Sequence, residues 1–259
     1  MGTLAGKVVF VTGTSSGIGR ATALAFAREG CRLAIAARRV ERLEALEPEL
    51  REAGAPDVHR QRLDVRDRTA DQAAVKAVAD HFGRIDVLLN NAGQARGLRS
   101  VEDGDETEWR DMVETNIMGL LWVTQATIPI MKAQGSGHII SLGSVAGHDS
   151  YAGGSVYAGT KFAERAICVA LRHELLGTHI RVSSVDPGLV DTEFSLVRFA
   201  GDSDRANNVY RGIQPLTGED VAECIVFAAS RPSHVNVDEI ILKPTAQASS
   251  TAVFREEEA

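Results

Sequence analysis

The stretch TGTSSGIG, residues 12–19, decides the fold of this chain. It directly follows a short β-branched run and opens a segment with apolar residues at helical spacing, GRATALAFAREG at residues 19–30. Gly13, Gly17 and Gly19 permit a tight turn and a close backbone approach. A pyrophosphate can then rest on the helix N-terminus, where unpaired N–H groups and the dipole favour negative charge. The glycines alone also fit a mere tight turn, but the strand-to-helix context favours a nucleotide-binding loop.

The same alternation of strand and helix continues along the chain. Seven β-branched or aliphatic runs predict strands: KVVFVTG (7–13), RLAIAAR (32–38), VHRQRLDV (58–65), IDVLLNNAG (85–93), GHIISLGS (137–144), HIRVSSVDPG (179–188) and DEIILKP (238–244). The segments between them have helical periodicity and often close on glycine. Strict alternation implies right-handed crossovers, and hence an α/β fold with a doubly wound parallel sheet. We expect a single domain over residues 1–244 and a loosely structured C-terminal tail over 245–259.

Composition narrows the class of protein. The chain has 259 residues, 44% of them hydrophobic, which is enough for one sizeable core. Its net charge of −7 and the lack of a dense basic run argue against a nucleic-acid partner. No signal-peptide pattern and no apolar run of the roughly 18 residues that span a bilayer is present, so we expect a cytoplasmic protein without a membrane partner. Cys31, Cys168 and Cys224 lack metal-ligand spacing and are interpreted as small buried hydrophobes.

Two arginines, Arg38 and Arg39, stand where the second predicted strand ends. A dinucleotide site that prefers NAD places an acidic residue here to bind the ribose 2′-hydroxyl. Arginine instead donates in a planar fork that suits the 2′-phosphate of NADP. Either arginine alone also fits the solvated start of the next helix. Together, after a glycine-rich turn, they favour NADP(H) as the cofactor.

Six motifs in this order resemble the short-chain dehydrogenase/reductase family over essentially the whole chain. They are TGTSSGIG, Asp64-Val65 after the third predicted strand, NNAG at 90–93, Ser144, YAGTK at 157–161 and Pro187-Gly188. The resemblance implies a seven-stranded Rossmann-type sheet in one domain, with NAD or NADP bound across it. It also implies a catalytic Ser, Tyr and Lys, often with an Asn.

The resemblance assigns the cofactor contacts by position. Asp64 and Val65 would flank the adenine, and Asn90 would stand near the adenosine ribose and help to fix the central strand. Residues 187–192 would line the nicotinamide side. With the glycine-rich loop and the arginine pair, the expected cofactor-binding residues are Gly13, Thr14, Ser15, Ser16, Gly17, Ile18, Gly19, Arg38, Arg39, Asp64, Val65, Asn90, Ala92, Gly93, Tyr157, Lys161, Pro187, Gly188, Val190 and Thr192.

The segment YAGGSVYAGTK, residues 151–161, offers two tyrosines before one lysine. Side chains at i and i+4 share a helix face, which Tyr157 and Lys161 satisfy and Tyr151 does not. A free tyrosine has a pKa of about 10, and a nearby ammonium with a positively charged nicotinamide would favour the phenolate. We therefore expect Tyr157 to act as the acid/base. By resemblance, Lys161 supports the phenolate and hydrogen-bonds the nicotinamide ribose, although surface Tyr–Lys pairs at this spacing are common.

By resemblance, Ser144 and Asn116 complete the catalytic set. Ser144 matches the family serine that hydrogen-bonds the substrate oxygen, whereas its rival Ser141 falls within a predicted strand and is expected to pack there. Asn116 matches the family asparagine whose backbone position holds a water that links Lys161 to solvent. A helix residue at a distorted turn is the alternative interpretation of Asn116. No His/Asp/Glu cluster indicates a metal site.

The residues that choose the substrate are expected in a flap, PGLVDTEFSLVRFAGD at 187–202. With SYAGGSVY and HVNVDEIILKPTAQ, this flap resembles a narrower branch, the NADP-dependent 3-hydroxy acid dehydrogenases that act on serine, allo-threonine and related compounds. An acid substrate needs a cation near Ser144, which Arg198 or Arg96 could supply, although either also fits a solvated surface role. The alternatives are an aldehyde or ketone reductase of other specificity, or a non-catalytic NADP-binding regulator on the same fold.

The resemblance also implies a homotetramer built on two long predicted helices, 106–132 and 155–177, and on C-terminal edges. Apolar residues on these helices could serve either that interface or the core of the subunit: Ile117, Leu120, Ala166 and Leu171.

Overall fold

Seven parallel strands form the central sheet of this computed structural model, which describes residues 4–256. The spatial order is β3-β2-β1-β4-β5-β6-β7. Strands β2 and β3 extend the sheet on one side of β1, and β4 to β7 extend it on the other, so the strand order reverses between β1 and β4. The strands are β1 (Val8–Thr12), β2 (Arg32–Ala37), β3 (Val58–Arg62), β4 (Val87–Asn90), β5 (Gly137–Leu142), β6 (Ile180–Pro187) and β7 (Glu239–Leu242). The predicted doubly wound α/β fold and its number of strands are confirmed.

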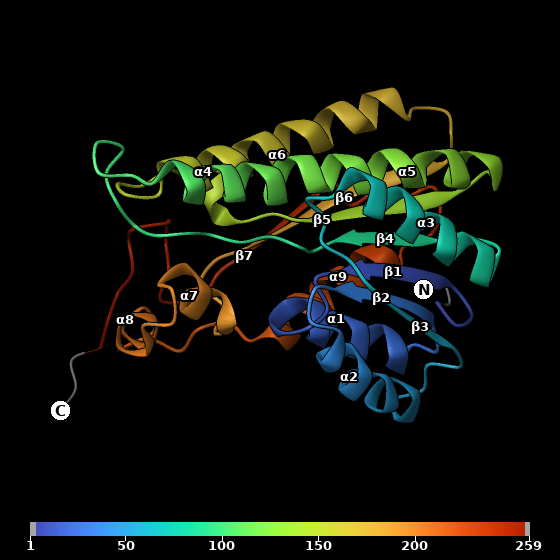
Figure 1. Cartoon of the computed structure of the whole chain (residues 1–259), viewed down its shortest axis with the longest axis horizontal. Helices are drawn as coiled ribbons and strands as arrows, with labels where there is room; N and C mark the ends of the chain where they lie inside the picture. The colour runs from blue at the N-terminus through green and yellow to red at the C-terminus, as the bar shows by residue number, and fades with distance from the viewer. Residues whose placement is uncertain (1–3, 257–259) are drawn as a thin grey trace.

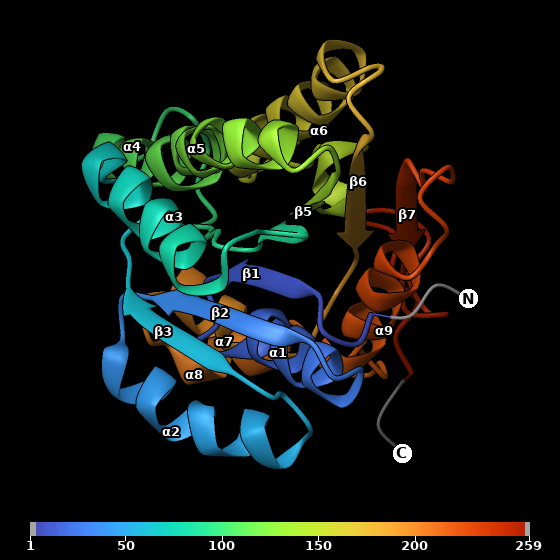
Figure 2. The ribbon, with the colours of Figure 1, turned by 90° about the vertical axis from the view of Figure 1, so that its right-hand side faces the viewer.

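Helices cover both faces of the sheet. They are α1 (Gly17–Arg28), α2 (Val40–Glu52), α3 (Arg68–Phe82), α4 (Glu106–Val113), α5 (Leu120–Ala133), α6 (Ser155–Glu174), α7 (Glu193–Arg198), α8 (Ser203–Asn208) and α9 (Gly218–Ala229). Figure 2 shows α1, α2 and α9 on one face and α3 to α6 on the other. None of the helices within residues 4–256 combines the length and the apolar character needed to cross a bilayer.

The core is two-sided because successive residues of a strand point to opposite faces. Val9 and Val11 of β1 pack in the layer beneath α1, α2 and α9. Val8 and Phe10 of the same strand pack in the layer beneath α3, α5 and α6. A strand that is buried on both faces reads as a continuous apolar run, which is why VVFV lacks alternation.

The predicted long helix 106–132 is interrupted. A π-helical turn, η1 (Glu114–Gly119), separates α4 from α5. Gly119 lies so close to the loop after β3 that a Cβ there would stand 2.7 Å from Val65 Cγ2. In the same turn the Asn116 side chain bonds to the chain after β4. These contacts widen the helix locally, and no feature of its apolar periodicity predicts them.

The two buried cysteines behave as predicted. Cys31 and Cys168 are free thiols within the core, and burial raises the pKa of each to about 12. Cys224 is only half-buried. A thiol that stays protonated in an apolar environment is a weak nucleophile, so the burial supports no catalytic role for Cys31 or Cys168.

The tail after Pro244 forms no helix or strand within the described residues, which end at Glu256. It is nevertheless fixed to the flap, because the buried Gln247 accepts a hydrogen bond from Leu189 N through Oε1 at 2.9 Å. Figure 1 shows the tail beside α7 and α8 at one end of the molecule. The predicted domain limit at residue 244 stays a prediction.

Candidate active site

A cavity of about 730 Å³ opens at the carboxyl ends of the strands. This is the edge at which open α/β sheets bind their ligands. The predicted site residues line it, with three exceptions: Thr14, Asn90 and Asn116. The cavity also extends under α7, α8 and the C-terminal tail, to Tyr210, Gln247 and Arg255. One continuous space therefore joins the glycine-rich loop to Tyr157 and Lys161.

The glycine-rich loop has the backbone that its sequence predicts. Gly13 and Gly17 adopt positive φ angles of 71° and 54°, which side chains with a Cβ rarely do. A Cβ on Gly13 would stand 2.8 Å from Asn91 Nδ2. Ser16, at the N-cap of α1, makes no side-chain capping bond, so the first N–H groups of α1 remain available to a ligand in the cavity. The loop therefore fits a pyrophosphate.

Thr14 and Asn90 support the site from outside the cavity. Thr14 is fully buried and donates from Oγ1 to Ala36 O at 3.2 Å, which ties the loop to β2. Asn90 Nδ2 donates to Thr124 Oγ1 at 2.9 Å, which ties β4 to α5. The neighbouring Asn91 lines the cavity in its place. This bond is consistent with the expected structural role of Asn90, and Asn91 Nδ2 holds the glycine-rich loop by donating to Thr12 O and Gly13 O.

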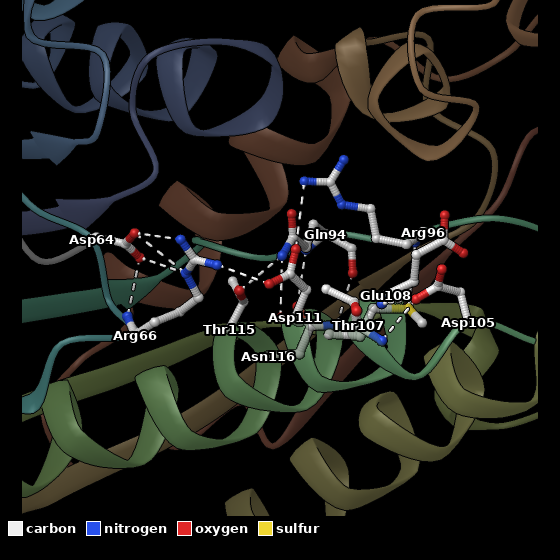
Figure 3. A network of polar contacts seen from close by, with 11 residues as sticks. Asp64, Arg66, Gln94, Arg96, Asp105, Thr107, Glu108, Asp111, Thr115 and Asn116 are labelled. Carbon is white, nitrogen blue, oxygen red and sulfur yellow. Dashed lines mark hydrogen bonds and ion pairs between the residues drawn. The ribbon is translucent and has the colours of Figure 1, made fainter.

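Asn116 is committed to structural hydrogen bonds in the π-helical turn. Its Oδ1 accepts from Gln94 N at 2.9 Å, and its Nδ2 donates to Gln94 O at 2.9 Å and to Thr160 Oγ1 at 3.0 Å. Figure 3 shows Asn116 beside Gln94. Thr160 precedes Lys161, so Asn116 joins the segment after β4 to the part of α6 that carries the lysine. Because the side chain is occupied, a relay role for this residue can only involve its backbone carbonyl.

Figure 3 shows a charged network beside the predicted adenine position. Arg66 pairs with Asp64 through Nη2 and Oδ2 at 2.7 Å and with Asp111 through Nη1 and Oδ1 at 2.9 Å. The hydrogen bonds from Arg66 hold the pKa of Asp64 below its usual range. Arg96 approaches Asp111 to 3.9 Å and does not line the cavity. Of the two cations predicted for an acid substrate, Arg198 lines the cavity, whereas Arg96 lies in a small separate pocket that Tyr157 and Arg198 also line.

Three of the four predicted catalytic residues line the part of the cavity beside the end of β5. Ser144 caps a short 3-10 turn, η2 (Val145–Gly147), and its Oγ accepts from Ala146 N at 3.1 Å. Tyr157 and Lys161 stand one turn apart on α6, which packs against η2. Tyr157 is 8% exposed, and Ser144, Tyr157 and Lys161 all line the cavity. Ser141 is buried within β5, as predicted for the rival serine.

Tyr151 holds an arginine over the site. Its phenolic oxygen accepts from Arg198 Nη2 at 2.7 Å. The guanidinium carbon of Arg198 lies 5.6 Å from the centre of the Tyr157 ring. Burial raises the pKa of Tyr151, although Arg198 opposes that shift. Tyr151 is therefore less suited to give or take a proton than a tyrosine with an ordinary pKa. The sequence does not predict this pairing because the two residues lie in separate segments.

Arg38, Arg39 and Arg42 form a group of arginines at one rim of the cavity, and the carboxylate of Glu193 pairs with two of them. Glu193, the first residue of α7, pairs with Arg39 at 2.9 Å and with Arg42 at 2.6 Å. Burial raises the pKa of Glu193, but the hydrogen bonds from Arg42 and Arg39 outweigh it, and the pKa is lowered. Arg38 is exposed at the same rim. Arg42, in the first turn of α2, is a further cation that the sequence pattern did not predict.

Comparison with known proteins identifies the chain. A family model described as short chain dehydrogenase matches residues 7–201. The chain belongs to the short-chain dehydrogenase family.

Relatives within this family are similar over nearly their whole length. The NADP-dependent 3-hydroxy acid dehydrogenase of Schizosaccharomyces pombe is 41% identical over 99% of this chain and all of its own. The sulfoacetaldehyde reductase of Chromohalobacter salexigens is 44% identical over 93% of this chain and 95% of its own. The closed form of serine dehydrogenase complexed with NADP⁺ superposes with a TM-score of 0.90 at 37% identity, covering 96% of this chain and all of its own.

A second polar cluster of this short-chain dehydrogenase joins the residue after η2 to strands β6 and β7. His148 Nε2 stands 2.6 Å from Asp186 Oδ2 and 3.9 Å from Glu239 Oε1. No sequence pattern predicted this cluster, because its members come from three separate segments of the chain. Arg165 Nε donates to Glu239 Oε1 at 2.8 Å, so both carboxylates have partners within the described chain. The arrangement is that of an ion-pair cluster, and we assign no ligand to it.

Proposed function

We propose that this short-chain dehydrogenase is an NADP-dependent oxidoreductase that acts on CH–OH groups and interconverts a small hydroxy compound with its carbonyl form. The observation that carries the proposal is the meeting of Ser144, Tyr157 and Lys161 in the cavity that also contains the glycine-rich loop. A loop shaped for a pyrophosphate and a proton donor at the far end of the same space fit a bound dinucleotide and a small substrate.

Each residue of the site has a role in this reaction. The bound cofactor supplies or accepts the hydride. Tyr157 gives its phenolic proton to the substrate oxygen during reduction and takes it back during oxidation. Ser144 Oγ hydrogen-bonds to the same oxygen and polarises it. Lys161 supports the phenolate and holds the nicotinamide ribose.

NADP is the cofactor that the charge of the rim favours. Arg39 and Arg42 hold a carboxylate in this structure. A phosphate carries more negative charge than a carboxylate, and the planar guanidinium group donates paired hydrogen bonds to either. The 2′-phosphate would take the place of the Glu193 carboxylate, with Arg38 beside it. The S. pombe relative and the similar solved structure are named with NADP.

The substrate that we propose is a small acid, such as serine, allo-threonine or another 3-hydroxy acid. In 3-hydroxy acids and in sulfoacetaldehyde, the substrates named for the relatives, one carbon separates the anionic group from the reacting carbon. Such an anion needs a cation near Tyr157. Arg198 lies there, and its hydrogen bonds within residues 4–256 go to Gly97 O and the Tyr151 hydroxyl, which are both uncharged. An aldehyde or ketone reductase of other specificity is the alternative.

The test of this function is a substrate panel read by NADPH absorbance in both directions. We expect turnover with 3-hydroxy acids and with sulfoacetaldehyde, and slower turnover with neutral alcohols and aldehydes of similar size. Turnover that is faster with the neutral compounds would favour the alternative reductase. Tight NADPH binding without turnover of any compound would favour the non-catalytic regulator.

Arg198 should contribute specificity for acids. Replacing Arg198 with leucine should lower kcat/KM for 3-hydroxypropanoate by about ten- to a hundredfold, because a charge-assisted hydrogen bond to the carboxylate is lost. The neutral analogue 3-hydroxypropanamide should change by less than about threefold. Steady-state kinetics with both compounds measure the difference.

Arg96→Leu is the matched control for Arg198→Leu, because Arg96 faces Asp111 outside the cavity. It should leave the ratio of the two kcat/KM values unchanged. An equal loss for acid and amide in Arg198→Leu would mean that this arginine only holds the flap through Gly97 O and Tyr151. The assignment of an acid substrate to Arg198 would then be wrong.

We also propose a homotetramer built on α4 to α6. Leu120 and Leu171 lie in the subunit core, whereas Ala166 is exposed on α6. Phe162 and Val169, 42% and 44% exposed, lie on the same helix and widen its apolar surface. Light scattering at micromolar concentration should give four times the subunit mass of 27.7 kDa. A monomer mass would contradict the proposed assembly.

A further inference from the structure

Lys161 shares its buried position with a carboxylate that the sequence motif does not include. Glu164 Oε2 accepts from Lys161 Nζ at 2.7 Å, and the same Nζ donates to Leu142 O at 2.7 Å. Lys161 is 7% exposed and Glu164 is 2% exposed. The second oxygen of Glu164, Oε1, is buried without a hydrogen-bond partner. The ammonium at the centre of the proposed mechanism is thus paired with a buried carboxylate.

A buried carboxylate at this place is costly without a counter-charge. Glu164 is on the face of α6 that turns toward the sheet, where the next residue of that face, Cys168, belongs to the apolar core. Removing a carboxylate from water is unfavourable unless a close opposite charge or hydrogen bonds offset the loss of solvation. Lys161 at i−3 is that charge. An apolar side chain would fill the position without this cost. Packing alone therefore does not explain why a charged residue stands at position 164.

The charged groups around the pair set the electrostatic context. Burial raises the pKa of Glu164 to about 7, although Lys161 opposes the shift and Asp186 of β6 adds to it. Burial alone would lower the pKa of Lys161, but Glu164, Tyr157 and Asp186 outweigh it, and that pKa is raised. Asp186 itself bonds to His148. Among these groups, Glu164 is the carboxylate that touches the ammonium.

We propose that Glu164 is a positioning residue that fixes the place and charge of Lys161, and thereby sets the pH at which the Tyr157–Lys161 unit gives up a proton. The inference rests on the proposed roles of Tyr157 and Lys161. An anion beside this unit opposes the loss of a proton from either member, whichever of the two releases it. Removing the anion must therefore make the unit lose its proton at lower pH.

The variant that isolates the charge is Glu164→Gln, which keeps the shape of the side chain. The pH dependence of kcat for oxidation is measured with the alcohol that gives the highest kcat/KM in the substrate panel. We expect the acidic limb of the profile to move to lower pH by about one unit, a tenfold gain in relative rate on the limb. Glu164→Asp, which restores a carboxylate, should return the limb toward the wild-type position. Glu174→Gln, an exposed acid at the end of the same helix, should not move it.

A second measurement tests the pair without any turnover. Lys161→Met leaves Glu164 buried without its cation, so the thermal midpoint at pH 8 should fall by roughly 5 to 10 °C. Adding Glu164→Gln to Lys161→Met should recover most of that loss, because the unpaired charge is gone. If the shifts in thermal midpoint from Lys161→Met and Glu164→Gln simply added in the double variant, the proposed coupling of the two residues would be contradicted.

The two measurements separate the failure of this inference from the failure of the proposed function. A folded Glu164→Gln enzyme whose limb stays in place, or moves to higher pH, overturns the positioning role. If Tyr157→Phe retains full turnover, the proposed function is wrong, yet the stability coupling of Lys161 and Glu164 would still be found. Coupling together with the expected shift of the limb supports the role of Glu164.

Discussion

Replacing Tyr157 with phenylalanine should lower kcat by roughly two to four orders of magnitude while NADPH still binds. The substitution keeps the ring, which is 8% exposed and packs 5.6 Å from the ring of Phe194. It removes the one proton that the substrate oxygen needs during reduction. Because packing is retained, the loss should appear in kcat and leave the cofactor affinity close to that of the wild type.

The matched control is Tyr151→Phe, which removes a hydroxyl from a second tyrosine that lines the same cavity. Its hydroxyl bonds to Arg198, so this change should mainly raise KM for acids and lower kcat far less. Stopped-flow and steady-state kinetics, with NADPH fluorescence for binding, measure all three quantities. The proposed acid/base would be the wrong tyrosine if Tyr157→Phe kept more than about a tenth of wild-type kcat, or if Tyr151→Phe lost more.

Local sequence patterns predicted the fold and the framework of the site because their physical causes are local. Apolar runs such as VVFV become central strands when helices cover both faces of the sheet. Gly13 and Gly17 take positive φ angles that their sequence context demands. Tyr157 and Lys161 meet through helical spacing alone. None of these features needs knowledge of a distant segment.

The contacts that sequence patterns did not predict all join distant segments or depend on burial. Arg198 reaches Tyr151 across 47 positions, and Glu193 reaches Arg39 across 154. Spacing places Glu164 on the same face of α6 as Lys161 and Cys168, but a charged residue there is ordinarily assigned to solvent, and only the fold shows that it is buried and paired with Lys161. Periodicity gives the face of a helix, but the neighbour of that face is set by tertiary packing.

Reversal of cofactor preference is the other large effect that we expect. Replacing Arg38 with aspartate and Arg39 with isoleucine should lower kcat/KM with NADPH by about a hundredfold or more and raise it with NADH. A carboxylate at position 38 would repel the 2′-phosphate and accept from the 2′-hydroxyl of NADH. Arg39 also bonds to Ser15, Ser16 and Glu193 in this structure, so its loss frees the first turn of α7 from the rim.

The ratio of kcat/KM for the two cofactors separates phosphate recognition from damage to the flap. A loosened flap would weaken catalysis with NADPH and NADH alike, whereas loss of phosphate recognition affects only NADPH. Arg51→Asp changes an arginine of α2 that pairs with Glu47 away from the cavity, so it should leave the ratio as it is. A wild-type enzyme with equal kcat/KM for both cofactors would contradict the assignment of these arginines to the 2′-phosphate. Arg38, Arg39 and Arg42 would then add nothing to the binding of NADPH that they do not also add to the binding of NADH.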